Sequence, residues 1–240
     1  MPNVDTTQSA QTAQSLTSYS NVLLKSQFGK PADSIDIVTD PRCFVFIYRG
    51  LTDAHDSRLP EDPDERYAHI YILLKQFIYP SLRPKIEAAS NQTISFAYMD
   101  WKIQTDTAMI AVFLHPEIEK AHEDLYAGKA DLHQHVETIT EKVQNPPISI
   151  ESFRMEGDLL LIVRTGLLIS LEKRLVKKGF NNELRLAKRE LELERFIEGL
   201  PIKELLGKKM KNAFLDWAFE DDVSLLTLEL EDDPDEDVDQ

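Results

Sequence analysis

Four of the six histidines stand close together in the sequence and are the first candidates for metal ligands: His115, His122, His133 and His135. A His-x-His pair such as His133 and His135 points its side chains to different faces of a helix, whereas helical metal sites favour a spacing of four residues. The polar surroundings instead favour solvent-exposed histidines in a connecting segment. The acidic run at 61–65 also lacks the glycine and the ligand spacing of a calcium loop. We therefore predict no metal site.

Two aspartates form the second candidate, because Asp100 and Asp216 directly precede the only two tryptophans, Trp101 and Trp217. A pair of carboxylates in one pocket could perform acid–base catalysis. We favour the alternative that each aspartate caps a strand end or a turn while the tryptophan fills the core, so that the two carboxylates lie well apart. The chain has no phosphate-binding loop, no dinucleotide-binding glycine motif, no nucleophile elbow and no Cys-x-x-Cys pair. The sequence therefore predicts a protein that is not an enzyme, with no catalytic residues and no cofactor.

A basic segment inside an acidic chain is the third candidate. The stretch from Arg164 to Lys211 holds thirteen Lys and Arg against seven Asp and Glu, although the whole chain has a net charge of -15. Seven of these cations define a predicted binding stripe for a ligand or a partner: Lys173, Arg174, Lys177, Lys178, Arg185, Lys188 and Arg189. On a helix they could bind an acidic protein, a nucleotide or an anionic membrane surface. They could equally form a solvated face of ion pairs or bind the acidic C-terminal tail, and the sequence leaves these alternatives open.

Length and composition limit the class of protein. With 240 residues, 42% of them hydrophobic, the chain can form one large or two small packed domains. Its negative charge argues against general nucleic-acid binding, which requires a basic surface. The single cysteine, Cys43, stands in an apolar run and is predicted to be a small buried side chain without a disulfide. No run reaches the roughly 18 apolar residues of a membrane span, and the polar N-terminus resembles no secretory signal. These features predict a soluble, cytoplasmic protein.

Strand and helix patterns recur in the same order in both halves of the chain. The stretch from Ser149 to Leu175 predicts a β-hairpin that leads into a helix, and the stretch from Ser34 to Leu59 has the same layout. Two further hairpins are expected at 93–114 and 212–230. Helices are expected at Ser15–Gln27, Asp64–Tyr79, Leu82–Ser90, Asp131–Val143, Leu168–Lys178, Glu183–Glu198 and Ile202–Met210. Pro80 is expected to end the second of these helices.

An internal duplication explains the repeated order. When the chain is shifted by 116 residues, Gly50 falls on Gly166 and Asp100–Trp101 falls on Asp216–Trp217, with no gap downstream of Gly50. Upstream of Gly50 the shift is 115, and the one-residue difference is expected in the hairpin turn. The predicted fold class is α+β: two homologous units, each a mainly antiparallel four-stranded sheet with packed helices, related by a pseudo-two-fold axis.

The same elements set the expected domain boundaries. The sequence predicts a disordered tail at 1–14, a first repeat unit at 15–117, a connector at 118–130, a second repeat unit at 131–230 and a disordered acidic tail at 231–240.

Two short motifs accompany the repeat. Gly29-Lys30-Pro31 ends the first expected helix, and Gly166–Leu175 reads G-L-L-I-S-L-E-K-R-L, with a looser copy at Gly50–Leu59. They resemble the MpsC-like family of small bacterial proteins, named for a sodium-translocating, membrane-potential-generating system. That family has a helix ending in Gly-basic-Gly-Pro, a hairpin, a Gly-x-Leu-Thr-x-x-Glu-Lys-x-Leu motif, helices and a closing hairpin. This chain has one glycine fewer and Ile169 in place of the threonine. The resemblance covers roughly residues 16–230, taken twice, and implies a divergent tandem duplication without defined catalytic residues.

Together these features predict a non-enzymatic cytoplasmic protein that works in protein–protein interaction or regulation. The resemblance implies that it is an accessory of a membrane ion or inorganic-carbon transport system. The alternative is a sensor that binds a small anion or a nucleotide between the two repeats. A sensor would gain thermal stability with its ligand, whereas an interaction protein would retain a partner in a pull-down.

Overall fold

The computed structural model describes residues 4–53, 56–114 and 125–233, and it describes side chains from residue 11 onward. The chain divides into two compact units, Met1–Glu117 and Ile118–Gln240.

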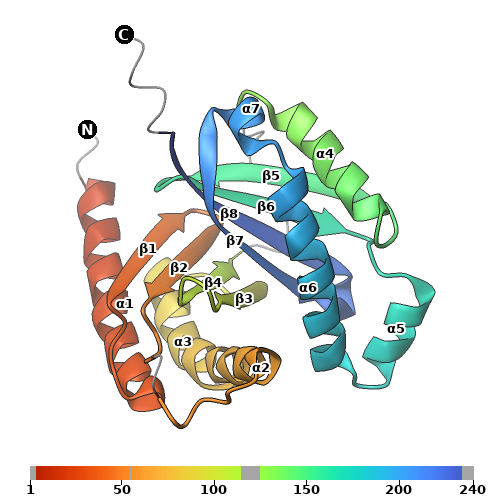
Figure 1. The fold of residues 1–240 in the computed structure, drawn as a ribbon. Coiled ribbons are helices and arrows are strands. Elements are labelled where there is room, and N and C mark those ends of the chain that lie inside the picture. The colour runs from red at the N-terminus through yellow and green to blue at the C-terminus, as the bar shows by residue number, and fades with distance from the viewer. Residues whose placement is uncertain (1–3, 54–55, 115–124, 234–240) are drawn as a thin grey trace. The chain divides into compact units, whose positions relative to one another are not determined.

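The first unit has a four-stranded antiparallel sheet with the strand order β1-β2-β4-β3 (Figure 1). Its elements are α1 (Val4–Phe28), β1 (Ser34–Asp40), β2 (Cys43–Arg49), α2 (Pro63–Leu73), a π-helical turn (Leu74–Ile78), α3 (Tyr79–Ser90), β3 (Phe96–Lys102) and β4 (Thr107–Phe113). Helix α1 contacts both β1 and α3, and α2 contacts β3.

The second unit has the same kind of sheet, with the strand order β5-β6-β8-β7. Its elements are α4 (Lys129–Glu141), β5 (Ser149–Met155), β6 (Leu159–Thr165), α5 (Ser170–Lys177), α6 (Asn181–Gly199), α7 (Ile202–Leu206), β7 (Lys208–Ala218), a 3-10 turn (Phe219–Asp221) and β8 (Val223–Asp232). Helix α6 packs on β7 and on α4, and α5 packs against α6 (Figure 1).

Strand register supports the internal duplication. Cys43 of β2 pairs with Phe113 of β4, and in the second sheet Leu159 of β6 pairs with Glu229 of β8. Both residues of the second pair lie 116 positions after those of the first. The α+β class with two similar units, each built on a four-stranded antiparallel sheet, is therefore confirmed. The two-fold axis relating the units stays a prediction.

A matched turn ties the two hairpins of each sheet together. The Gly50 N–H donates to the carbonyl of Asp106 at 2.9 Å, and the Gly166 N–H donates to the carbonyl of Asp222 at the same distance. All four residues have positive φ, at 65° and 72° for the glycines. Glycine suits this left-handed conformation because it has no Cβ, and aspartate tolerates it better than most other residues.

The central strands form the core of each sheet. Strand β2 reads C-F-V-F-I-Y-R, and its first six residues, including Cys43, are buried. In the second unit, β6 packs into a cluster with α4 and α6 that contains Leu160, Leu132 and Phe196. Each fully buried side chain of this size contributes about 1.5–3 kcal/mol to stability. The buried, unbridged cysteine agrees with the sequence prediction.

The N-terminal helix is longer than the sequence predicts. Residues 4–14, expected to be a disordered tail, form the first turns of α1. This segment contains no glycine and no proline, so nothing in it ends a helix that Leu16 and Leu24 anchor in the core. Polar composition alone was therefore a poor guide to its backbone.

Pro80 was predicted to end a helix, but the helical region continues through it. The chain remains helical from Pro63 to Ser90, and a π-helical turn at Leu74–Ile78 ends two residues before the proline. Proline lacks an N–H and crowds the preceding turn, and a wider π-helical turn relieves this conflict without ending the helix.

The C-terminal boundaries also shift. Helix α7 is short, and β7 begins at Lys208, within the range predicted to be helical. Glu231 and Asp232, placed in the predicted tail, belong to β8, and the buried Asp233 forms ion pairs with Lys203 and Lys209 at 2.5 and 2.6 Å. Residues 234–240 of that tail and 118–124 of the predicted connector lie outside the described residues, and α4 begins at the end of the connector range.

Candidate functional site

The predicted basic stripe does not form one surface. Arg185 and Lys188 point into the core from α6 and are 4% and 5% exposed. Arg189 is half-buried, and the other four residues are exposed on α5 and at its C-terminal end. Helix α6 divides its cations in this way because the residues at 185, 188, 192 and 196 follow the three-to-four spacing of its inward face.

Arg164 of β6 is the centre of the inward-facing charges and is fully buried. Its guanidinium donates to Oε2 of Glu192 and to Oγ1 of Thr140, both at 3.0 Å. It also lies 4.8 Å from the ring centroid of Phe196, a cation–π distance. Burial lowers the pKa of Arg164 below its ordinary value, and the charge of Glu192 opposes that effect. The arginine is held as a cation by its partners.

Lys188 extends this network to the two neighbouring helices. Its Nζ lies 2.8 Å from Oε1 of Glu172 on α5 and 3.1 Å from Oε1 of Glu192 on α6. It also donates to the side-chain oxygen of Gln144, whose Nε2 donates to Oε2 of Glu192 at 2.9 Å. Glu172 uses its other oxygen to accept the N–H of Ile169 at 2.9 Å, which secures the first turn of α5. One network thus connects β6, the end of α4, α5 and α6.

A second buried ion pair lies beside the first. Arg185 pairs with Asp216 of β7, donates to the carbonyl of Trp217 at 3.1 Å and stacks 4.8 Å from the ring centroid of Phe219. Lys188 lies 5.6 Å from the Trp217 ring. The buried charges together comprise three cations, Arg164, Arg185 and Lys188, and three carboxylates, Glu172, Glu192 and Asp216. Buried charges are tolerated when they are paired and hydrogen-bonded in this way.

The first unit has an almost uncharged version of the same layer. Four buried residues of α2 and the π-helical turn have the spacing of the inward face of α6: Tyr67, Ile70, Leu74 and Ile78. The Tyr67 hydroxyl donates to Oδ1 of Asp100 at 3.0 Å, in the place where Arg185 pairs with Asp216. These two helices therefore correspond with a shift of 118 residues. The gap-free shift of 116 predicted downstream of Gly50 is wrong for them, because the connecting loops differ in length.

The equivalents of the network residues follow from this correspondence. Arg164 corresponds to Tyr48, which is buried and hydrogen-bonded to Ser20 at 3.3 Å. Glu192 corresponds to Leu74, and Lys188 corresponds to Ile70. The charged network is therefore specific to the second unit. Two features of the sequence could have indicated this network. Arg164 is a lone charge in an apolar strand, and Arg185, Lys188 and Glu192 occupy positions with the spacing of the apolar face of a helix.

The two aspartates have structural partners. Oδ1 of Asp100 and Oδ1 of Asp216 each accept the N–H of the following tryptophan at 2.8 Å, and both tryptophans are buried. The buried tryptophans agree with the preferred interpretation, whereas both aspartates lie within strands rather than at strand ends. The separation of the two carboxylates stays a prediction.

Two of the candidate histidines lie on α4. Nε2 of His133 lies 2.7 Å from Oγ of Ser152, which is also hydrogen-bonded to the Tyr126 hydroxyl. Burial, with a contribution from Lys129, lowers the pKa of His133 and favours the neutral ring. His115 and His122 lie outside the described residues, and no set of three potential metal ligands occurs among the residues with described positions.

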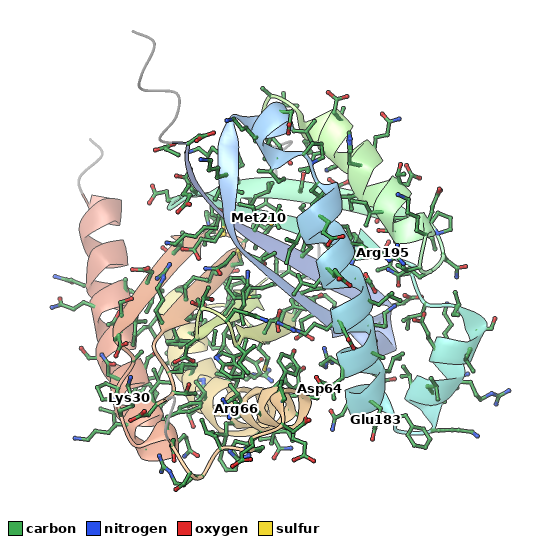
Figure 2. The ribbon with its side chains drawn as sticks, viewed as in Figure 1. Lys30, Asp64, Arg66, Glu183, Arg195 and Met210 are labelled. Atoms are coloured by element: carbon green, nitrogen blue, oxygen red, sulfur yellow. The ribbon has the colours of Figure 1, made fainter. Side chains whose placement is uncertain are left out.

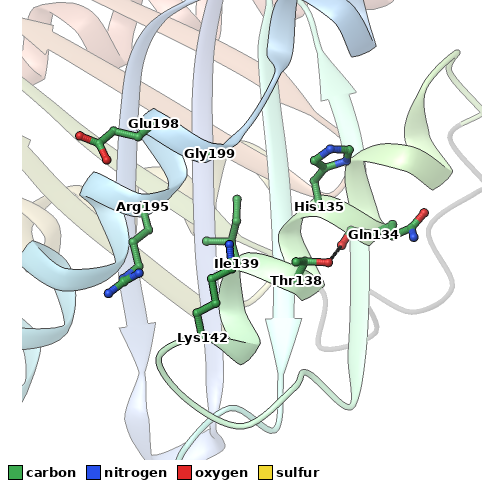
Figure 3. Close-up of a pocket in the computed structure, with 8 residues that line it drawn as sticks. All are labelled: Gln134, His135, Thr138, Ile139, Lys142, Arg195, Glu198 and Gly199. Carbon is green, nitrogen blue, oxygen red and sulfur yellow. Dashed lines mark hydrogen bonds between the residues drawn. The ribbon is translucent and has the colours of Figure 1, made fainter.

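A pocket of about 420 Å³ opens between α4 and α6 (Figure 3). It is lined by Gln134, His135, Thr138, Ile139, Lys142, Arg195, Glu198 and Gly199. Figure 2 places Glu183 near the first turn of α6 and Arg195 near its last turns, so the pocket is at the C-terminal end of this helix. It belongs entirely to the second unit.

An exposed basic and apolar surface is the remaining feature. We call it the α5 surface and define it by Leu171, Arg174, Lys177, Lys178 and Phe180, all of which are exposed. Leu171 and Phe180 have exposed fractions of 64% and 46%, which is high for side chains of this size. Lys173 lies beside it and pairs with Asp222 at 3.0 Å.

Within the described ranges, no helix is long and apolar enough to cross a membrane. Comparison of the chain with protein-family models, with curated proteins and with solved structures finds no match.

Proposed function

We propose that this chain is a non-enzymatic protein that binds a protein partner through the α5 surface and acts by interaction or regulation. The observation that carries the proposal is a set of three exposed cations, Arg174, Lys177 and Lys178, which are flanked in the sequence by two exposed apolar side chains. None of the three forms an ion pair with any residue whose position is described. A surface of this composition binds an acidic segment that also carries an apolar residue.

The charge of the rest of the molecule favours this choice of partner. The chain has a net charge of -15, so an acidic partner is repelled by most of its surface. The α5 surface is a local exception, and complementary charge both speeds association and sets orientation. Arginine and aromatic side chains are also the residue types that most often dominate binding energy. We therefore expect Arg174 and Phe180 to contribute most.

The α5 surface is held on a rigid support. Glu172 connects the first turn of α5 to Lys188 in the core, and Lys173 pairs with Asp222 next to β8. Little conformational freedom is then lost when a partner binds, which favours affinity. We further propose, from the MpsC-like resemblance, that the partner is a cytoplasmic part of a membrane ion or inorganic-carbon transport system.

Affinity purification of the tagged full chain from its native cell, followed by mass spectrometry, tests the proposal. The test variant is Arg174→Glu with Lys178→Glu, and the matched control is Lys25→Glu with Lys85→Glu, which reverses two exposed cations of the first unit. We expect the wild type and the control to retain the same partner and the test variant to lose it. A partner retained equally by all three proteins would contradict the assignment of the α5 surface.

A further inference from the structure

The pocket between α4 and α6 has the chemistry of a ligand site that is separate from the α5 surface. Its volume of about 420 Å³ lies within the range of small-molecule sites, roughly 300–1,000 Å³. The pocket contains two cations from facing helices, Lys142 and Arg195, and neither forms an ion pair with a residue in the described part of the chain. Figure 3 shows Lys142 extending along the gap between the helices, whereas Arg195 and Glu198 leave α6 in diverging directions.

The rest of the pocket offers contacts for the body of a ligand. His135 donates from Nδ1 to the carbonyl of Asp131 at 2.9 Å, which leaves Nε2 for a ligand group. Gln134 adds an amide on the same helix, and Ile139 with Gly199 forms an apolar floor. An added Cβ at Gly199 would lie 3.1 Å from Cδ1 of Ile139, so the glycine keeps this floor open.

Buried hydrogen bonds join the two helices that line the pocket. The last turns of α4 are joined to α6 by the Gln144–Glu192 hydrogen bond at 2.9 Å, and Arg164 connects Thr140 of α4 to the same glutamate. All of these side chains are buried. The backbone positions from which Lys142 and Arg195 extend are therefore fixed before any ligand binds, which favours recognition of an anion.

We propose that this pocket binds a phosphorylated small molecule of the size of a mononucleotide or a sugar phosphate. Lys142 and Arg195 bind the phosphate, since a guanidinium and an ammonium are the usual protein donors to phosphate oxygens. His135 and Gln134 bind polar groups of the ligand body, which rests on Ile139 and Gly199. This inference does not depend on the α5 surface binding a partner.

Isothermal titration calorimetry with the full chain tests the proposal. The probes are AMP, glucose 6-phosphate and inorganic phosphate, with adenosine and glucose as their uncharged counterparts. We expect one of the two organic phosphates to bind with one-to-one stoichiometry, inorganic phosphate to bind more weakly and the uncharged counterparts not to bind. The absence of saturable binding of AMP and glucose 6-phosphate would overturn the proposal. Binding of inorganic phosphate as tight as that of the organic phosphates would overturn the role given to the ligand body.

Four variants locate the binding site. Lys142→Gln and Arg195→Gln should each lower the affinity about tenfold, the loss expected for one charge-assisted hydrogen bond. Lys25→Gln, which removes an exposed cation of the first unit, should leave the affinity unchanged. Gly199→Ala should weaken binding of the organic phosphate more than binding of inorganic phosphate, because the methyl group narrows the floor. Equal affinities for the wild type, Lys142→Gln and Arg195→Gln would overturn the site.

Discussion

Arg164 and Glu192 form a fully buried ion pair in the second unit, with Nη2 of the arginine 3.0 Å from Oε2 of the glutamate. In the first unit the equivalent residues are Tyr48 and Leu74, which are also buried. The same fold is thus built once with an apolar layer and once with a charged layer. The charges are not needed to form the fold, so they are a specialisation of the second unit. The charged network connects α5, which carries the α5 surface, with α4 and α6, which line the proposed ligand pocket.

The network predicts a large penalty for removing one charge. Glu192→Leu leaves Arg164 and Lys188 in the core without their shared carboxylate. Breaking a buried pair in this way costs about 3–5 kcal/mol in the free energy of unfolding. Urea denaturation followed by tryptophan fluorescence measures this loss.

The first unit supplies the matched control for that experiment. The triple variant Arg164→Tyr, Lys188→Ile and Glu192→Leu introduces the residues found at the equivalent positions of the first unit. We expect it to regain much of the stability that Glu192→Leu loses, because both buried cations are removed together with their shared carboxylate, and Glu172 keeps the hydrogen bond from the Ile169 N–H. A triple variant less stable than Glu192→Leu would show that the two layers are not interchangeable.

The two aspartates should differ in their contribution to stability. Asp100→Asn retains an acceptor for the Tyr67 hydroxyl and should cost about 1 kcal/mol, as for a single neutral hydrogen bond. Asp216→Asn leaves the buried Arg185 without its carboxylate and should cost about 3–5 kcal/mol. Urea denaturation of the two variants side by side makes the comparison. Equal losses would contradict the assigned ion pair.

We expect protonation of His133 to destabilise the folded protein in mild acid. Its pKa is lowered in the folded protein from the ordinary value of 6.5, so the unfolded chain binds the proton more readily. The stability contributed by the neutral ring is complete above about pH 6.5 and is lost as the pH falls through the folded-state pKa. His133→Gln should reduce the difference in melting temperature between neutral pH and about pH 5. An unchanged difference in the variant would rule out this role of His133.

Substitution of two glycines with positive φ distinguishes the cost of backbone strain from the cost of a steric clash. Gly128 and Gly207 have φ values of 80° and 65°. An added Cβ at Gly128 would lie 2.2 Å from the carbonyl oxygen of Leu205, whereas at Gly207 it would meet nothing within 4 Å. Gly207→Ala should therefore cost only the left-handed strain of about 1–2 kcal/mol. Gly128→Ala should cost clearly more, because the backbone of α7 must move. Equal melting temperatures of the two variants would contradict the close approach of these segments.

Local signals in the sequence predicted the sheets well. The hairpin turns, the equivalent glycines Gly50 and Gly166, and the two Asp–Trp pairs are all short motifs that can be recognised from residues near one another in the chain. Helix ends were harder to predict. The first turns of α1 are polar but helical, and Pro80 is accommodated by a π-helical turn, because packing of the neighbouring turns outweighs the local preference in both cases.

The sequence by itself determined the duplication, the α+β class and the antiparallel pairing, because alternating apolar residues and turn residues act over short distances. Only the tertiary structure decided which cations are buried. Arg185 and Lys188 stand in the same basic segment as Arg174 and Lys178, yet the first two are in the core and the last two are exposed. The face that α6 turns toward its sheet makes this division, and the partners of Arg164 come from helices distant in the sequence. A charge becomes part of a core or of a surface only when packing sets its surroundings.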